Sequence, residues 1–466
     1  MNGHQNDIIT AISTPPGIGG IAIIRLSGKG CIELADNIFN SPSGKKLIDQ
    51  AANTVHFGSI ISDDSVLDEV LVSVFHTPHS FTGEDSIEIS CHGSLYIQQN
   101  ILQILIEKGA RLATAGEFTQ RAFLNGKMDL SQAESVADLI ASTSAATHRL
   151  AMNQMRGGFS NKIIELRTDL LNFTSLIELE LDFSEEEVEF ANRESLKHAA
   201  KHIESLISKL ADSFSLGNAI KTGIPVAIIG ETNAGKSTLL NLLLNEDKAI
   251  VSDIHGTTRD VIEDTVNIQG LTFRFIDTAG IRDTYDEIES LGIERTFQKL
   301  KQASIVLWVI DSTTDDNHIA ELYEKLRPNL TGQKVILVFN KIDVVGCGVI
   351  MDKKSTILQD EIPDRIFISA KYNEGVTDLQ KKLIDTANVP EINEQDVIVT
   401  NIRHYEALEN ARQAIQRAIQ GLEDNISGDF LSQDIRECMH YLGEITGQIS
   451  TDEILGNIFS KFCIGK

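Results

Sequence analysis

The spacing of apolar residues changes twice along the chain and divides it into three kinds of segment. Residues 1–125 contain short β-rich runs such as IAIIRLSG, EVLVSVFHT and SIEISCHG, and one helical run, YIQQNILQILIEKGA. From Lys127 to about Leu216, apolar residues recur at i, i+3, i+4 and i+7, which predicts long helices. Strands alternating with helices begin at GIPVAIIGETNAGKS, and the helical pattern returns at NIRHYEALENARQAIQRAIQGLEDNI.

This order predicts a multidomain α/β protein in which an α/β domain is inserted into a helical domain. The N-terminal α+β domain is expected to span residues 1–125. The helical domain is expected in two parts, 126–221 and 389–466, and the inserted domain between them at 222–388. The sequence shows no internal repeat and no low-complexity stretch.

Composition restricts the setting of these domains. The chain has 466 residues, of which 42% are hydrophobic and 23% charged, as is ordinary for soluble globular proteins. Its five cysteines stand singly, without a CxxC pair, which favours a reducing compartment. No apolar run approaches the roughly 20 residues that span a bilayer, and the N-terminus lacks an export signal. We therefore expect a cytoplasmic protein without a membrane anchor.

The charge balance limits how the chain can bind nucleic acid. It carries 41 basic and 67 acidic residues, a formal net charge of -26. Lys and Arg contacts to phosphate supply most non-specific affinity for RNA, so this chain alone is poorly suited to hold RNA. If RNA is a substrate, a basic partner is expected to carry much of the contact.

The strongest chemical motif is GETNAGKS, which fits G-x-x-x-x-G-K-[ST]. Glycines in this loop let backbone N–H groups surround phosphate oxygens, while Lys236 reaches the β and γ phosphates and the Ser237 hydroxyl ligates Mg²⁺. The motif stands between the apolar runs PVAII and TLLNLLL, which gives the strand-loop-helix context that it requires.

Three further motifs each follow an apolar run, in the order DTAG, NKID and SAK. Asp277 of DTAG can reach Mg²⁺ through water, and the Gly280 amide can contact the γ phosphate. Asp343 of NKID can accept from both N1–H and N2–H₂ of guanine, which adenine cannot match, so the set selects GTP. The expected GTP-binding residues in these motifs are Asn233, Ala234, Gly235, Lys236, Ser237, Thr238, Asp277, Thr278, Ala279, Gly280, Asn340, Lys341, Asp343, Ser369, Ala370 and Lys371.

Two acidic or polar segments are candidates for the switches of a GTPase. SDIHGTTRD lies between the P-loop and DTAG, and Thr258 is expected to complete the Mg²⁺ shell; the alternative is a polar surface loop. Ile281 stands where many small GTPases have the glutamine that orients water. The sequence pattern does not choose among the acids that follow, which are Asp283, Asp286, Glu287, Glu289 and Glu294.

The chain ends in FSKFCIGK, with Cys463 fourth from the end. Gly465 and Lys466 fit no prenylation box, so a lipid anchor is not expected. A frayed tail is one alternative. However, DEILGNIFSKF has apolar residues at helical spacing, which predicts a docked last helix that holds the end in place.

These residues resemble the MnmE (TrmE) family of tRNA-modification GTPases. The resemblance rests on STPPGIGGIAIIRLSG, PHSFTGEDSIEISCHG, GEFTQRAFLNGKMDLSQAESVADLI, the four GTPase motifs, GTTRD and FCIGK, and it runs over the whole length. It implies an N-terminal domain that dimerises and binds 5-formyl- or 5,10-methylene-tetrahydrofolate, and a Ras-like GTPase activated by potassium-dependent dimerisation.

The resemblance also implies a homodimer that works with the flavoprotein MnmG (GidA) in a heterotetramer or larger complex. The partner brings FAD and NADH, and the complex adds an aminomethyl or carboxymethylaminomethyl group to C5 of the wobble uridine of certain tRNAs. The tRNA would be bound mainly in the complex. Two rival interpretations are a GTPase switch in ribosome assembly and a folate-binding module without RNA chemistry.

Carried over residue by residue, the resemblance assigns further roles. It implies that Glu289 positions the attacking water and that Cys463 acts as a thiolate nucleophile or a polar contact. One departure is Thr232, where the family usually has proline, which affects only the stiffness of the loop. The implied potassium ligands are Asn233, Ser252, Ile254 and Thr257, with Ser252, Thr257 and Thr258 also near GTP. The implied folate contacts are Arg25, Glu88, Lys127 and Lys466.

Overall fold

The computed structural model describes residues 7–62, 65–182, 193–247, 264–276, 300–345, 357–390, 393, 396–424 and 426–465. The chain forms two compact units, each of which is described by itself. The first comprises Met1–Ile140, Met152–Ile207 and Ala407–Lys466, and the second comprises Ala141–Ala151 and Ser208–Glu406. Both ends of the chain therefore belong to the first unit.

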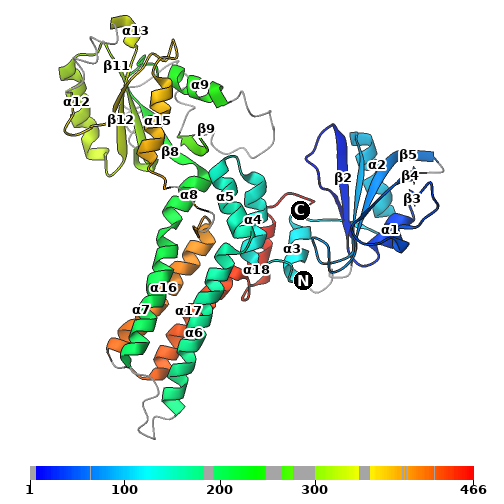
Figure 1. Cartoon of the computed structure of the whole chain (residues 1–466). Coiled ribbons are helices and arrows are strands. Elements are labelled where there is room, and N and C mark those ends of the chain that lie inside the picture. The colour runs from blue at the N-terminus through cyan, green and yellow to red at the C-terminus, as the bar shows by residue number, and fades with distance from the viewer. Residues whose placement is uncertain are drawn as a thin grey trace. The chain divides into compact units, whose positions relative to one another are not determined.

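The first unit begins with a seven-stranded sheet, of which Figure 1 labels β2, β3, β4 and β5. The strand order is β3-β4-β5-β6-β2-β1-β7. Its neighbours pair antiparallel, except β1 with β7. The strands are β1 (Ile9–Ile12), β2 (Gly19–Ser27), β3 (Phe39–Asn40), β4 (Thr54–Ser62), β5 (Ser65–Phe75), β6 (Ser86–Gly93) and β7 (Arg111–Leu112). Helices α1 (Cys31–Asp36) and α2 (Leu95–Glu107) and the 3-10 turn η1 (Leu47–Asp49) complete the domain.

Alternation along the strands gives this sheet two different faces. In β5, Val70, Val72 and Val74 are buried, whereas Leu71 between them is exposed. The buried face packs with Ile101 and Leu105 of α2 into one core. The α+β prediction for this segment is confirmed, with period-2 strands and a helical cover on one face.

The rest of the first unit is helical. Figure 1 shows α6 (Gly158–Asp182), α7 (Arg193–Asp212), α16 (Ile402–Glu423) and α17 (Gly428–Thr446) as long helices, and contacts join α6 to α17. The shorter helices of this unit are α3 (Glu117–Leu124), α4 (Leu130–Ala141) and α18 (Asp452–Phe459), whereas most of α5 (Ala145–Met155) belongs to the second unit. A separate cluster packs α4 against α18 through Leu130, Ala133, Leu455 and Phe459. Within the described ranges, no helix has the length and apolar character needed to cross a membrane.

The second unit is built on a six-stranded sheet in the order β13-β12-β11-β8-β10-β9. Only the β9–β10 pair is antiparallel. The strands are β8 (Ile224–Ile229), β9 (Asp264–Ile268), β10 (Leu271–Phe275), β11 (Ile305–Asp311), β12 (Lys334–Asn340) and β13 (Arg365–Phe367). The helices are α8 (Phe214–Thr222), α9 (Lys236–Asp247), α12 (Asp316–Leu326), α13 (Ile342–Val345) and α15 (Val376–Ala387), with the 3-10 turn η2 (Arg327–Asn329).

Helices cover both faces of this sheet. Val309 of β11 packs in a cluster with Leu239 of α9 and Leu379 of α15, and its neighbour Trp308 packs in another with Ile319 of α12. A strand buried on both faces reads as a continuous apolar run, as IVLWVI does. The α/β prediction and its insertion between helical segments are therefore confirmed.

Candidate functional site

The GETNAGKS motif, residues 230–237, is the P-loop, and it joins the end of β8 to the start of α9. Asn233 and Gly235 have φ of 66 and 95, in the region that favours glycine and tolerates asparagine. A Cβ on Gly235 would overlap Nδ2 of Asn340, so the motif glycine is required for packing as well as for φ. The loop thus passes directly into the N-terminus of α9, and the N-terminus of a helix suits an anion.

The lysine of the P-loop is folded over the loop itself. Lys236 Nζ donates to the carbonyl oxygens of Gly230 at 2.8 Å and Glu231 at 2.7 Å. Ser237 follows in the first turn of α9, and Thr238 is exposed beside it. The Lys236 ammonium and the Ser237 hydroxyl therefore both follow the carboxyl end of β8.

Asn340 joins three of the predicted motifs. Its side chain is buried at 3% exposure; Nδ2 donates to Ala234 O at 2.8 Å, and Oδ1 accepts from Ala370 N at 3.0 Å. Ser369 Oγ donates to Asp343 Oδ1 at 2.6 Å. The structure thus brings the P-loop, NKID and SAK together at the carboxyl ends of β8, β12 and β13.

The sequence motifs missed the partner of Lys341. Its Nζ lies 2.7 Å from Asp311 Oδ2, and Ser312 Oγ donates to Lys341 O at 3.1 Å. Burial raises the pKa of Asp311, but hydrogen bonds from Lys341 and Thr313 outweigh it and hold that pKa below its ordinary value. The ends of the two apolar runs could have indicated this pair, because Asp311 ends one strand and Asn340, next to Lys341, ends the parallel strand beside it in register.

Several predicted residues fall outside the described part of the chain, and their roles stay predictions. These residues are Ser252, Ile254, Thr257, Thr258, Asp277, Thr278, Ala279, Gly280, Glu289 and Lys466. In the described ranges, no three or more His, Cys, Asp or Glu side chains are grouped so as to hold a metal ion. Lys371 is described, and its Nζ lies 4.9 Å from the centroid of the Tyr372 ring.

A second group of predicted residues gathers on the N-terminal sheet. Arg25 of β2 and Glu88 of β6 are cross-strand partners, with Nε donating to Oε1 at 2.9 Å. The guanidinium carbon lies 5.5 Å from the centroid of Phe81 and 5.6 Å from that of Phe118. The two charged side chains are 21% and 26% exposed. Arg25 is thus fixed by an ion pair and two rings but remains accessible to a ligand.

Lys127 lies against the loop that carries Phe81. Its Nζ donates to Pro78 O at 2.9 Å, and a Cβ on Gly83 would lie 3.2 Å from Lys127 Cγ. Residues 76–85 between β5 and β6 therefore lie close to both predicted cations, Arg25 and Lys127. We call residues 76–85 the β5–β6 loop.

The C-terminal tail is tied down, as the helical spacing of its apolar residues predicted. Ile464 forms a β-bridge with Ala115, and Cys463 O accepts from Gly116 N at 3.4 Å. Ser13 Oγ donates to Gly465 O at 3.2 Å. The side chain of Cys463 is exposed. Since Gly116 precedes α3, which carries Phe118, the tail and the Arg25 cluster both contact the beginning of this helix.

Comparisons with known proteins agree over the whole chain. A family model described as "GTP-binding protein TrmE N-terminus" matches residues 8–127, and one described as "MnmE helical domain" matches residues 130–463. Proteins named tRNA modification GTPase MnmE from Bacteroides thetaiotaomicron and Bacteroides fragilis are each 60% identical to it, covering 99% of this chain and 100% of the relative.

Among solved structures, the chain is similar to Era from Aquifex aeolicus at 29% identity. That match covers 41% of this chain and 66% of Era, with a TM-score of 0.28. The assignment rests on the family models and the full-length relatives, together with the nucleotide motifs that the fold assembles. The chain therefore belongs to the MnmE family and is a GTPase, an enzyme that hydrolyses GTP.

Proposed function

We propose that this chain is a potassium-activated GTPase of tRNA modification that acts in the cytoplasm with a flavoprotein of the MnmG type. In this proposal the complex modifies C5 of the wobble uridine, with a folate supplying one carbon. The observation that carries the proposal is the end-to-end similarity to proteins named tRNA modification GTPase MnmE. The net charge of -26 supports a partner that holds much of the tRNA.

In the GTPase step, the chain's own residues bind and orient the nucleotide. The Asp343 carboxylate, oriented by Ser369, would accept from the two guanine donors, and Lys236 would bind the phosphates. Mg²⁺, when bound, would neutralise phosphate charge. Ser237 is the described residue that would hold it, in the first turn of α9.

The potassium part of the proposal rests on Asn233. Its left-handed backbone and exposed side chain support an amide oxygen presented beside the P-loop, and oxygen ligands suit a hard cation. The remaining proposed ligands are Ser252, Ile254 and Thr257. A cation held there would offset charge that develops on the phosphates, and Glu289 would orient the attacking water.

The folate part of the proposal rests on the Arg25 cluster. A folate has a flat polar ring system and an anionic tail, which suit the aromatic faces of Phe81 and Phe118, the Glu88 carboxylate and the Lys127 ammonium. When bound, the folate would supply the one-carbon unit. The C-terminal tail supplies two further proposed residues, Lys466 and Cys463. The backbone of Cys463 is hydrogen-bonded to Gly116 at the start of α3, and its thiol is exposed.

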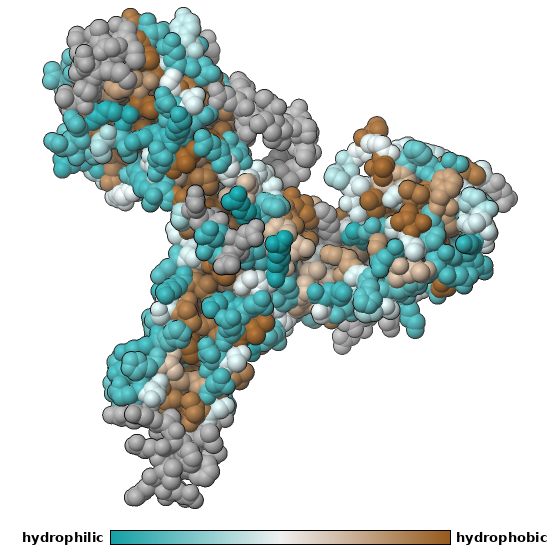
Figure 2. Space-filling model, viewed as in Figure 1, coloured by the Kyte–Doolittle hydropathy of each residue, from teal (hydrophilic) through white to brown (hydrophobic). Residues whose placement is uncertain are grey.

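The proposed homodimer is supported by apolar residues on the N-terminal domain. Ile18 and Ile21 are 86% and 69% exposed, and Val55, Phe57 and Leu71 on β4 and β5 are 60%, 54% and 47% exposed. Figure 2 shows hydrophobic residues at the surface of this domain. Exposed apolar residues gathered on one sheet are typical of an interface.

The test is complementation of a strain that lacks this gene, with mass spectrometry of its tRNA nucleosides. The unchanged protein should restore the modified wobble uridine, and Lys236→Ala should not, because phosphate binding is lost. Cys463→Ser, or deletion of residues 463–466, should keep GTP hydrolysis near normal but greatly reduce modification.

Each outcome of this test has a separate meaning. Full modification by the Cys463→Ser and truncated proteins would contradict the proposed role of the tail. A deletion strain with normal wobble uridine and accumulated ribosomal subunits would instead favour a switch in ribosome assembly.

A further inference from the structure

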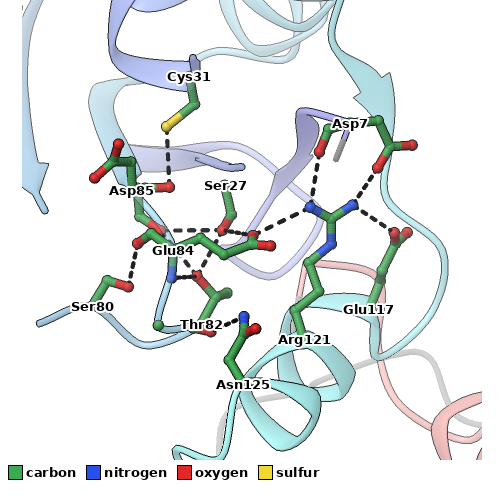
Figure 3. A network of polar contacts seen from close by, with 12 residues as sticks. Asp7, Ser27, Cys31, Ser80, Thr82, Glu84, Asp85, Glu117, Arg121 and Asn125 are labelled. Atoms are coloured by element: carbon green, nitrogen blue, oxygen red, sulfur yellow. Dashed lines mark hydrogen bonds and ion pairs between the residues drawn. The ribbon is translucent and has the colours of Figure 1, made fainter. Parts of the chain in front are cut away.

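A buried polar network lies behind the β5–β6 loop, and Arg121 of α3 is at its centre (Figure 3). Its side chain is only 8% exposed. NH1 donates to Asp7 O at 2.9 Å and to Glu84 Oε2 at 3.2 Å, and NH2 donates to Asp7 Oδ1 at 2.6 Å and Glu117 Oε1 at 3.2 Å. One guanidinium therefore joins the start of the chain, the β5–β6 loop and its own helix.

The inner side of the β5–β6 loop is held to this network. Glu84 Oε2 also accepts from Ser27 Oγ at 2.8 Å, and Ser27 Oγ lies 2.7 Å from Thr82 Oγ1. Asn125, one helical turn after Arg121, donates from Nδ2 to Thr82 O at 2.8 Å. Figure 3 shows these side chains converging on the loop from β2 and α3. Arg121 of α3, and Asn125 directly after its end, thus fix the loop at Glu84 and Thr82.

The same loop contributes to the Arg25 cluster. Phe81, next to Thr82, places its ring 5.5 Å from the guanidinium carbon of Arg25, and Pro78 O accepts from Lys127. The second ring at Arg25 comes from Phe118, on α3 itself. Any movement between α3 and the loop would therefore change the distance between the two rings beside Arg25.

We propose that Arg121 is a positioning residue for the folate pocket: it acts through Glu84 to hold the β5–β6 loop, and with it Phe81, against α3 and Arg25. This inference rests on the folate part of the proposed function. Arginine suits the position because its planar group donates to Glu84, Asp7 and Glu117 at once, whereas the single ammonium of lysine cannot reach the same three positions.

A substitution at the neighbouring Arg111 can distinguish this positioning role from a general contribution to the stability of the network. Arg111 also bonds Asp7 and Glu117, with Nε donating to Asp7 Oδ2 at 2.8 Å and NH2 donating to Glu117 Oε1 at 2.6 Å. Its other hydrogen bonds, from NH1 to Glu117 Oε2 at 3.1 Å and to Leu112 O at 2.9 Å, are also outside the β5–β6 loop. Arg111→Lys is thus a matched control: it weakens the same network without touching Glu84.

The experiment compares 5-formyl-tetrahydrofolate binding to the full-length unchanged, Arg121→Lys and Arg111→Lys proteins by calorimetry. Thermal unfolding and GTP hydrolysis are measured on the same samples. Arg121→Lys should weaken folate binding by about tenfold or more, because loss of a charged hydrogen bond releases the loop. Its GTP turnover should be unchanged. Arg111→Lys should keep folate affinity within about twofold even where it lowers the melting temperature, since its bonds are elsewhere.

Two further variants keep the inference testable if Arg121→Lys fails to fold. Glu84→Gln keeps the shape of the side chain and removes its charge, and it should also weaken folate binding. In a Phe81→Leu background, the effect of Glu84→Gln or Arg121→Lys on folate affinity should shrink, because the residue through which they act is gone.

The outcomes distinguish the inference from the proposed function. If the unchanged protein binds no 5-formyl-tetrahydrofolate, the folate function fails and the inference with it. If it binds, but Arg121→Lys and Glu84→Gln bind equally well, only the positioning role is overturned. Equal weakening by Arg121→Lys and Arg111→Lys, in proportion to their melting temperatures, would also overturn it, because that pattern reports stability alone.

Discussion

Gly235 and Asn340 provide a quantitative test of how the nucleotide site is packed. A Cβ on Gly235 would overlap the Nδ2 atom with which Asn340 holds Ala234 O, so Gly235→Ala must displace the Asn340 side chain. Asn340→Ala removes the same side chain outright. The two substitutions therefore lose the same two hydrogen bonds and should be strongly coupled.

The magnitudes follow from burial. Ala234 and Ala370 are 2% and 4% exposed, so their backbone groups lose their Asn340 partner with little access to water. Each such loss costs about 1–3 kcal/mol, which makes about 2–6 kcal/mol for Asn340→Ala. Gly235→Ala should cost a similar amount plus about 1–3 kcal/mol of backbone strain at its φ of 95. Because the two hydrogen bonds can be lost only once, the double variant should cost less than the sum by about 2 kcal/mol or more, at or above the upper end of measured couplings.

Trp308 provides a selective assay. The chain has 1 tryptophan, and Trp308 is 2% exposed in the core of the second unit. Urea unfolding of the nucleotide-free protein, followed by tryptophan fluorescence, therefore reports the free energy of unfolding of this unit. A coupling of this size is a large fraction of the roughly 5–15 kcal/mol that stabilises a domain.

Gly332 provides the control for backbone strain alone. Its φ is 107, and a Cβ there would meet nothing within 4 Å. Gly332→Ala should therefore destabilise by strain and add to Asn340→Ala within about 0.5 kcal/mol. If Gly235→Ala and Asn340→Ala are also additive within that margin, the glycine is not required for Asn340 packing and the reasoning is refuted.

Three further predictions concern the proposed potassium site, the binding of the guanine nucleotide and the pH dependence of stability. Asn233→Ala should abolish a stimulation of GTP turnover by K⁺ over Na⁺; equal turnover of the unchanged protein in the two salts would contradict the potassium site. Asp311→Asn should weaken GDP binding about tenfold in a fluorescent-nucleotide titration, because Lys341 loses its charged partner; unchanged affinity would show that Asp311 does not position Lys341. Burial raises the pKa of Glu117, but hydrogen bonds from Arg111 and Thr114 hold it below its ordinary value of 4.5, so the folded state binds fewer protons than the unfolded chain. The stabilisation by the Glu117 carboxylate is complete above a pH of about 4.5 and is lost as pH falls below it. The melting temperature of the N-terminal domain should therefore be lower at about pH 3.5 than at about pH 6, and this difference should be smaller in Glu117→Gln.

The sequence predicted the features whose signal is local. IVLWVI is a continuous apolar run because β11 is buried on both faces, and EVLVSVF alternates because β5 is covered on one. The P-loop, NKID and SAK could be located because each follows such a strand. Parallel strands that end at the same edge of a sheet then bring the three motifs together without further information.

The unpredicted features depend on charged side chains that are buried and on partners that are distant in sequence. Arg121 contacts Asp7 and Glu84, which are 114 and 37 positions away, and no periodicity marks these pairs. On an amphipathic helix a lone arginine is normally interpreted as exposed, yet this one is 8% exposed. Three carboxylates offset the cost of its burial, and only the tertiary fold shows that they converge.

The C-terminal tail and the nucleotide motifs belong to different units, so the proposed role of the tail should be separable from GTP hydrolysis by mutation. Ile464 and Gly465 are held by Ala115 and Ser13, so these two residues depend on the N-terminal segment for their position. The nucleotide motifs lie in the second unit, between these two ends in sequence but in a separate core. An insertion of this kind is tolerated because it leaves the contacts of its host intact. A change in the tail should therefore leave the hydrogen bonds of Asn340 to Ala234 and Ala370 unchanged. Loss of the packing of α18 at Phe459 would instead release Cys463 from the start of α3.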